Sequence, residues 1–161
     1  MEKELRVGIA DCKIGSSPQQ IITIGLGSCV GIAIFDYQKK IGGLAHIMLP
    51  DSTQFSNVNN KYKFANLAIP QLVEGLVALG ANKKRLQAKI AGGASMFNFS
   101  DKSMVMDIGK RNIDAVKEAL GKECIPIMAQ DVGGNKGRSI RFDTETGFVN
   151  VKIIGEKTIE I

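Results

Sequence analysis

Two short segments of the chain carry apolar residues on both faces of an extended strand. They are Val30–Phe35 and Leu44–Leu49, and the second contains one polar residue, His46. A half-exposed strand alternates apolar and polar residues, whereas a strand that is covered on both faces is apolar throughout. The pattern therefore predicts two buried strands. Turn-forming residues follow at Pro50, and the polar stretch 51–61 is expected to be a loop.

Shorter patterns predict the remaining strands. Leu86, Ala88 and Ile90 alternate with polar residues, which is typical of a half-buried strand, and Gly92-Gly93 ends it. Four further strands are expected at Ile21–Ile24, Ile125–Ala129, Ser139–Phe142 and Phe148–Ile154. The turn-rich residues between the last two indicate a hairpin.

Two other segments repeat apolar residues at helical spacing. The first is Ala65–Leu79, and Gly80 follows it as a C-terminal cap. Pro70 lies inside this segment, where proline removes a backbone hydrogen bond, so we expect either a kink or a helix that begins near it. The second helix is expected to run from an N-cap at Asp107 to Gly121.

These elements indicate an α+β fold. A chain of 161 residues is by default one domain, which would span residues 1–161. Strands in this number with two main helices are expected to form layers, as a single-domain α/β sandwich with a mixed sheet.

The composition excludes several classes of protein. Hydrophobic residues make up 44% and charged residues 23%, which is ordinary for a globular protein. The net charge is +5, but no basic stretch is interleaved with aromatic residues, so we expect no nucleic-acid partner. The uncharged and mainly apolar stretch Ile21–Phe35 is shorter than the ~20 residues of a membrane helix. With three scattered cysteines and no signal-peptide pattern, we expect a cytoplasmic protein without membrane insertion.

Two glycine-rich segments resemble cofactor-binding motifs but do not match them. The spacing Gly25-x-Gly27-x-x-x-Gly31 is one residue off a dinucleotide fingerprint, and it leads into a strand instead of a helix. The segment Gly133–Ser139 is too short for a phosphate-binding loop, and Arg138 stands where that loop has its lysine. One histidine and three scattered cysteines offer no metal-ligand spacing. We therefore expect neither a cofactor nor a metal.

Cys29 is the candidate nucleophile. It lies in a glycine-flanked turn between two apolar runs, and glycine lets a substrate and backbone N–H groups approach the sulfur closely. A thiol attacks as the thiolate, which a nearby imidazole can generate. The only histidine of the chain is His46. It lies on the predicted strand Leu44–Leu49, the second strand after the one that contains Thr23.

A hairpin of Ile21–Ile24 and Val30–Phe35 would bring these residues together, with His46 on a strand alongside. Cys29 would then attack a carbonyl carbon and His46 would carry the proton. Thr23 would accept a hydrogen bond from the other imidazole nitrogen and fix its tautomer. The Cys29 N–H or its neighbours would form part of an oxyanion hole.

The alternative is that these residues only pack. A lone cysteine or histidine in an apolar region is often a core residue, and threonine is common in strands. Cys12 and Cys124 lack a partner histidine and are expected to be packing residues.

Five blocks follow one another along nearly the whole chain. They are TIGLGSCV at 23–30, GLAHIMLP at 43–50, AGGASMF at 91–97, IGKRN at 108–112 and DVGGNKGR at 131–138. Together they resemble the CheD family, the chemoreceptor glutamine deamidases of chemotaxis.

The resemblance implies a protein-glutamine glutaminase, an amidohydrolase of signal transduction. A Cys-His-Thr triad of Cys29, His46 and Thr23 would hydrolyse glutamine side chains of chemoreceptors to glutamate and release ammonia, with no cofactor. The implied fold is an α/β sandwich similar to the catalytic domain of cytotoxic necrotizing factors. The implied partners are the chemoreceptors and the CheC phosphatase. The alternative function is that of a mainly non-catalytic regulator that binds the CheC-type phosphatase.

Two glycine-rich or basic features of the sequence each allow a structural and a functional interpretation. The glycine pairs at 92–93 and 133–134 are either strand-end turns or a rim that lets a receptor helix approach. Lys136 and Arg138 either meet an acidic receptor surface or belong to a solvated face.

Overall fold

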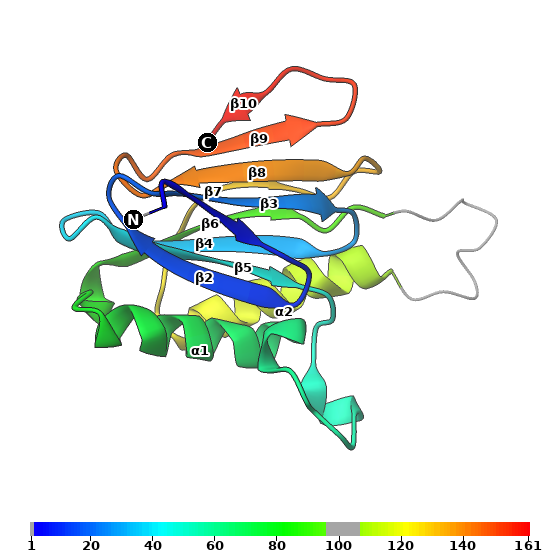
Figure 1. Ribbon diagram of the computed structural model, residues 1–161. Coiled ribbons are helices and arrows are strands. Elements are labelled where there is room, and N and C mark those ends of the chain that lie inside the picture. The colour runs from blue at the N-terminus through cyan, green and yellow to red at the C-terminus, as the bar shows by residue number, and fades with distance from the viewer. Residues whose placement is uncertain (1, 96–106) are drawn as a thin grey trace.

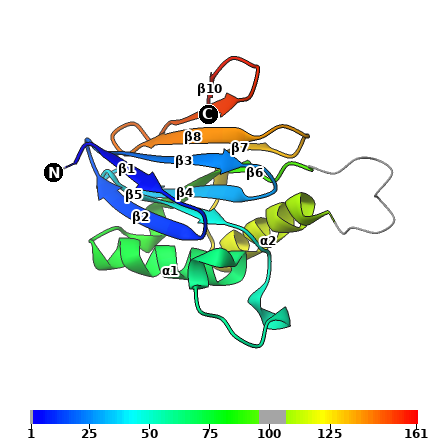
Figure 2. The same cartoon turned by 45° about the vertical axis from the view of Figure 1, so that its right-hand side comes forward.

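The computed structural model describes residues 2–95 and 107–161, and their elements form three layers (Figure 1). Two five-stranded sheets lie face to face, and two long helices cover the far face of one of them. We call the sheet between the other two layers the central sheet and its partner the outer sheet. Figure 2 shows the same order of layers after a turn of 45°.

Both sheets mix parallel and antiparallel pairs. The outer sheet has the order β1 (Glu4–Val7), β3 (Gln20–Leu26), β8 (Arg138–Asp143), β9 (Val149–Ile153) and β10 (Ile159–Glu160). The central sheet has the order β2 (Asp11–Ser16), β5 (Ile41–Ile47), β4 (Val30–Asp36), β6 (Leu86–Gly92) and β7 (Ile127–Val132). The β1–β3 and β6–β7 pairs are parallel, and the other pairs are antiparallel. The expected α+β sandwich is confirmed, with two mixed sheets.

The position of strand β4 between two covering layers explains why its sequence is apolar throughout. All seven of its residues are buried. Val30, Ile32 and Ile34 pack in the core between the central sheet and the helices. Ala33 and Phe35 pack in the core between the two sheets. The prediction of two strands buried on both faces is confirmed by β4 and by β5, which is buried from Gly42 to Ile47.

The helical layer consists of α1 (Ala65–Ala78) and α2 (Ile108–Lys122). Helix α1 includes Pro70, so the alternative that it begins near the proline is wrong. Ala65, Ala68 and Ile69, before Pro70, are fully buried, and this burial holds the first turns in place despite the lost hydrogen bond. Helix α2 begins with the expected N-cap, since the Asp107 side chain accepts from the Lys110 N–H.

The predicted hairpin of β3 and β4 is wrong. Strand β3 pairs with β1 and β8, whereas β4 pairs with β5 and β6. The chain crosses from the outer to the central sheet between Leu26 and Val30, at the right-hand end of Figure 1. Gly25, with a φ of +75°, supplies a backbone conformation that other residues rarely adopt just before this crossing. Only the central sheet is covered on both faces, which is the position that the apolar β4 requires.

The hairpin of β8 and β9 is confirmed. Strands β1, β2 and β10 were not expected. The alternation of polar and apolar residues covers only four positions in β1 and four in β2, and β10 has two residues. Met96 and Phe97, the end of one of the five sequence blocks, lie outside the described residues. The single domain over 1–161 stays a prediction.

A buried carboxylate anchors the far end of β4. Asp36 is fully buried and accepts hydrogen bonds from the Arg85 Nε and Nη2 atoms at 3.1 and 2.9 Å. The backbone N–H groups of Asn82, Gln38 and Lys39 also donate to it. Burial alone would raise the pKa of this carboxyl, but the hydrogen bonds outweigh it and hold the pKa at about 2.

We expect Asp36→Asn to lower the free energy of unfolding at neutral pH by roughly 2–3 kcal/mol. This is less than the ~3–5 kcal/mol of a fully buried pair, because the Arg85 side chain is 25% exposed. The folded-state pKa of about 2 lies below the ordinary 3.8. The stabilisation is therefore complete above about pH 4 and is lost as the pH falls toward about 2.

Urea denaturation at several pH values checks this expectation. The difference in unfolding free energy between wild type and Asp36→Asn should shrink below about pH 4. Asp114→Asn is the matched control, because Asp114 is 66% exposed, and it should change stability by less than about 0.5 kcal/mol. A difference that is constant down to about pH 2 contradicts the expectation.

Candidate functional site

A buried hydrogen bond joins the two sheets where Thr23 of β3 faces His46 of β5. The Thr23 Oγ1 atom lies 2.7 Å from His46 Nδ1, and both side chains are buried. The Thr23 hydroxyl also donates to the Val7 carbonyl oxygen at 2.8 Å. A hydroxyl carries one hydrogen, so toward the ring it accepts, and Nδ1 must be the protonated nitrogen. The arrangement leaves His46 Nε2 without a hydrogen in the neutral ring.

This unprotonated nitrogen is available for chemistry. His46 Nε2 is buried and has no hydrogen-bond partner within the described residues. Burial lowers the pKa of His46 to about 4, because the imidazolium would be poorly solvated there. At neutral pH the ring is therefore uncharged, and Nε2 can accept a proton.

Cys29 lies at the start of the strand next to His46. It immediately precedes β4, and Gly31 of β4 pairs directly with His46 of β5. The Cys29 side chain is half-buried and packs against the core between the two sheets, the layer in which Thr23 and His46 meet. Burial raises the pKa of the Cys29 thiol, and its own backbone N–H offsets this only in part. At neutral pH the Cys29 side chain is therefore a thiol and the His46 ring is a neutral imidazole.

The turn that carries Cys29 is held by the end of β6. The Gly93 N–H donates to the Cys29 carbonyl and the Ala94 N–H donates to the Gly27 carbonyl, each at 2.8 Å. Gly92 has a φ of +110°, and a β-carbon there would overlap the Cys29 carbonyl oxygen. These contacts favour the structural interpretation of the 92–93 glycine pair, as a turn that approaches the Cys29 backbone closely.

Asn112 is a residue of this region that sequence reasoning did not single out. It lies on α2, is fully buried, and donates from Nδ2 to the Ser28 and Met48 carbonyl oxygens, each at 2.9 Å. Its signals in the sequence are an amide on the apolar side of a helix and its place at the end of the block IGKRN. Within the described residues, His46 Nε2 and Asn112 Oδ1 are the buried side-chain nitrogen and oxygen atoms that lack a partner.

The other two cysteines differ from each other. Cys12 packs against the core under the helices, as expected, and burial together with Asp11 raises the pKa of its thiol to about 12. The expectation that Cys124 packs is wrong, because its side chain is exposed. Cys124 follows the end of α2 with a φ of +57°, in a left-handed turn at the surface.

The two basic residues of the 133–139 segment also separate. Arg138 is 7% exposed, and its Nε atom donates to Asp131 Oδ2 at 2.9 Å. Its Nη1 atom donates to the Gly92 carbonyl, so it supports the β6 end and belongs to no solvated face. Lys136 is exposed and pairs with Glu156 at 3.0 Å.

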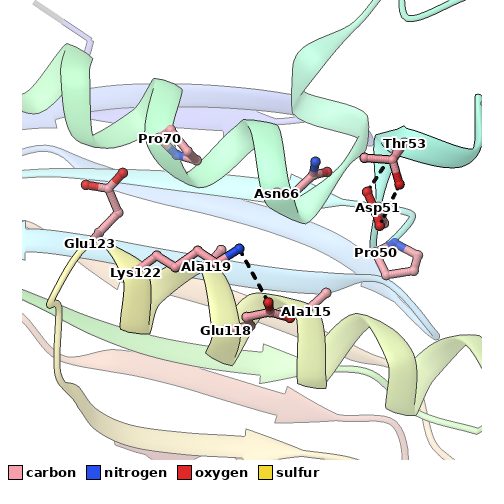
Figure 3. A pocket seen from close by; sticks show the side chains of 10 residues that line it. All are labelled: Pro50, Asp51, Thr53, Asn66, Pro70, Ala115, Glu118, Ala119, Lys122 and Glu123. Carbon is pink, nitrogen blue, oxygen red and sulfur yellow. Dashed lines mark hydrogen bonds and ion pairs between the residues drawn. The ribbon is translucent and has the colours of Figure 1, made fainter.

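A separate cleft lies between the two helices (Figure 3). Its volume is about 310 Å³, and none of Thr23, Cys29 and His46 lines it. Its lining residues are Pro50, Asp51, Thr53, Asn66, Pro70, Ala115, Glu118, Ala119, Lys122 and Glu123. Lys122 pairs with Glu118 along α2 at 3.4 Å, as Figure 3 shows. The charged groups of the cleft therefore pair or face solvent, and it offers no convergent chemistry.

The described residues contain neither a metal-binding cluster nor a membrane-spanning helix. No group of three or more His, Cys, Asp or Glu side chains in residues 2–95 and 107–161 is arranged to hold a metal ion. No helix in the same ranges is long and apolar enough to cross a membrane.

Comparison with known proteins places the chain among proteins of chemotaxis. A family model described as CheD chemotactic sensory transduction matches residues 48–153. A protein of Clostridium botulinum named "Probable chemoreceptor glutamine deamidase CheD" is 65% identical over 159 residues, or 99% of this chain and 98% of that protein. A protein of the same name from Clostridium kluyveri is 62% identical over the same shares. The chain belongs to the CheD family.

One solved structure shares the fold. The crystal structure of the Bacillus licheniformis hypothetical protein YfiH matches with a TM-score of 0.50 and 14% identity, over 78% of this chain and 51% of that chain. At this level of sequence identity, the structural similarity shows a related sandwich fold and carries no information about chemistry. The expected similarity to the cytotoxic necrotizing factor domain stays a prediction.

The protonation states of the free site can be measured directly. Since the chain has one histidine, its NMR titration is unambiguous, and the pKa should be about 4. In a Cys12→Ser/Cys124→Ser variant, alkylation by iodoacetamide reports Cys29 alone, and its rate should keep rising with pH beyond the ordinary thiol pKa of ~8.5. A rate plateau at neutral pH, or a histidine pKa of 6.5 or more, would indicate a thiolate–imidazolium pair instead.

Proposed function

We propose that the protein is a chemoreceptor glutamine deamidase, which hydrolyses the side-chain amide of receptor glutamines to glutamate and releases ammonia. The observation that carries the proposal is the Thr23–His46 hydrogen bond, which leaves His46 Nε2 free next to the strand that begins after Cys29. The names of the two clostridial relatives support the same substrate.

The first half of the proposed reaction forms a thioester. His46 Nε2 takes the proton of the Cys29 thiol as the sulfur attacks the amide carbon of the glutamine side chain. The imidazolium then gives this proton to the departing nitrogen, which leaves as ammonia. The hydrogen bond from Nδ1 to Thr23 keeps the ring in place while its charge changes.

The second half restores the thiol. Water attacks the thioester carbon while His46 Nε2 takes one of its protons. The sulfur leaves and regains that proton, and glutamate is released. Each turnover consumes one water and needs no cofactor.

The neutral resting pair is compatible with this scheme. A pKa of about 4 keeps His46 unprotonated throughout the neutral range, so the base is available at every turnover. Proton transfer then accompanies the attack on bound substrate instead of preceding it.

We also propose a cellular location and a protein partner. Three free cysteines agree with a cytoplasmic protein. The CheC phosphatase is the proposed protein partner, on the family resemblance alone. The second candidate function is that of a mainly non-catalytic regulator that binds this phosphatase.

Mass spectrometry of a chemoreceptor cytoplasmic fragment tests the activity. Wild-type protein should add the mass change of amide-to-acid conversion at specific glutamines, and Cys29→Ala should reduce the rate by at least about 10³-fold, since the nucleophile is lost. Cys124→Ala is the matched control, because Cys124 is exposed and outside the site. Deamidation that persists in Cys29→Ala would exclude Cys29 as the nucleophile.

The regulatory alternative makes a different prediction. If catalysis is the main role, Cys29→Ala should bind a CheC-type phosphatase with unchanged affinity and still fail to restore chemotaxis in a strain that lacks this protein. Isothermal titration and a swimming assay measure the two properties. Full restoration by Cys29→Ala would favour the regulator over the enzyme.

A further inference from the structure

Asn112 connects the two segments that carry the proposed nucleophile and base. Its Nδ2 atom donates one hydrogen bond to the Ser28 carbonyl, in the turn before β4, and one to the Met48 carbonyl, just after β5. Both bonds are 2.9 Å long, and the Asn112 side chain is fully buried. A side chain of the helical layer thus ties the Cys29 turn to the end of the His46 strand.

The amide is suited to this position. Its NH2 group has two hydrogens, and each reaches one carbonyl oxygen. The opposite orientation would place Oδ1 against the same two oxygens, so the direction of the amide is fixed. An aspartate could not donate, and an aliphatic side chain would leave two buried carbonyls unpaired.

The bond to Ser28 also sets the direction of the next N–H. The Ser28 C=O and the Cys29 N–H belong to one planar trans peptide group and point to opposite sides of the chain. The carbonyls of Gly27 and Cys29 are held in turn by Ala94 and Gly93. All three carbonyls of the turn are therefore occupied by the end of β6 and by α2.

Two N–H groups of this turn have no oxygen acceptor among the described residues. They are the backbone N–H groups of Ser28 and Cys29, whereas the Gly27 N–H donates to the Gly25 carbonyl oxygen at 3.2 Å. The Cys29 N–H also lies next to the sulfur of its own residue. Donors held in a fixed direction next to a nucleophile are what a developing oxyanion requires, because they need no reorganisation during the reaction.

We propose that Asn112 is a positioning residue, which holds the Ser28–Cys29 peptide so that the Cys29 N–H points at the oxyanion formed on the substrate carbonyl. The inference rests on the proposed function and deepens it. Asn112 acts through the backbone and does not touch the substrate. Its bond to Met48 holds the end of β5 at the same time, which keeps His46 in register with the turn.

The test compares Asn112→Ala and Asn112→Ser with wild type in the deamidation assay. We expect kcat to fall about 10- to 100-fold, below the ~10²–10³-fold loss of an oxyanion donor that is removed outright, with KM within about threefold. The Cys29 alkylation profile and the His46 titration should not change. A merely structural role would alter these two profiles together with kcat, and that result would overturn the proposal.

Asn66→Ala is the matched control. Asn66 is also an asparagine of the helical layer that pairs with a loop, Ser52, but it lies away from the Cys29 turn. Its kcat should stay within about twofold of wild type, because its hydrogen bonds go to Ser52 and not to the Cys29 turn or the end of β5. Asn112 variants that match this control in kcat would overturn the proposal.

A measurement on the unmodified protein covers the case in which the variants fail to fold. The probe is a receptor peptide in which an aldehyde replaces the side-chain amide of the target glutamine. The Cys29 sulfur adds to the aldehyde carbon and the thiol proton passes to His46, so that the aldehyde oxygen becomes an oxyanion. The Cys29 amide proton should then move downfield in the NMR spectrum. A Cys29 amide signal that does not move would overturn the proposal, whereas absence of wild-type deamidation would overturn the proposed function itself.

Discussion

Coverage of the central sheet on both faces is the constraint on which the rest of the structure depends. Strand β4 is buried over its whole length, so one side of it must meet the helices and the other side the outer sheet. Any polar group on the inner faces of β3 or β5 is then removed from water and must find a partner between the sheets. Thr23 Oγ1 and His46 Nδ1 satisfy this requirement for each other, with the Val7 carbonyl as the acceptor of the hydroxyl, and His46 Nε2 is the atom left without a partner among the described residues.

The groups of the proposed site come from all three layers. The outer sheet supplies Thr23, the central sheet supplies His46 and the start of β4, and the helical layer supplies Asn112. Packed layers move little relative to one another, because interiors are as dense as crystals of small molecules. A catalytic arrangement built across layers is therefore as rigid as the core, whereas one built on a single loop would depend on that loop.

Much of the fold could be predicted from the sequence, and the errors have physical causes. The apolar runs and the N-cap at Asp107 are local signals, and the corresponding elements are present. The hairpin of β3 and β4 is wrong because sequence neighbours usually pair, but here the chain changes sheet at Gly25–Cys29. Thr23 and His46 still meet, across the sandwich instead of across a hairpin. Asn112 was missed because its two bonds join segments that lie 84 and 64 residues away.

The half-buried, uncharged state of Cys29 has a consequence for the life of the protein in the cell. Peroxide oxidises thiolates much faster than thiols, and cysteine enzymes that hold a permanent thiolate pass readily to the sulfenic and sulfinic acids. In Cys29 burial raises the thiol pKa, so the sulfur carries no charge at neutral pH. In the proposed mechanism its reactivity is confined to the moment when a carbonyl is in place to receive it, and the proposed nucleophile is protected from oxidants without a disulfide or a resolving cysteine.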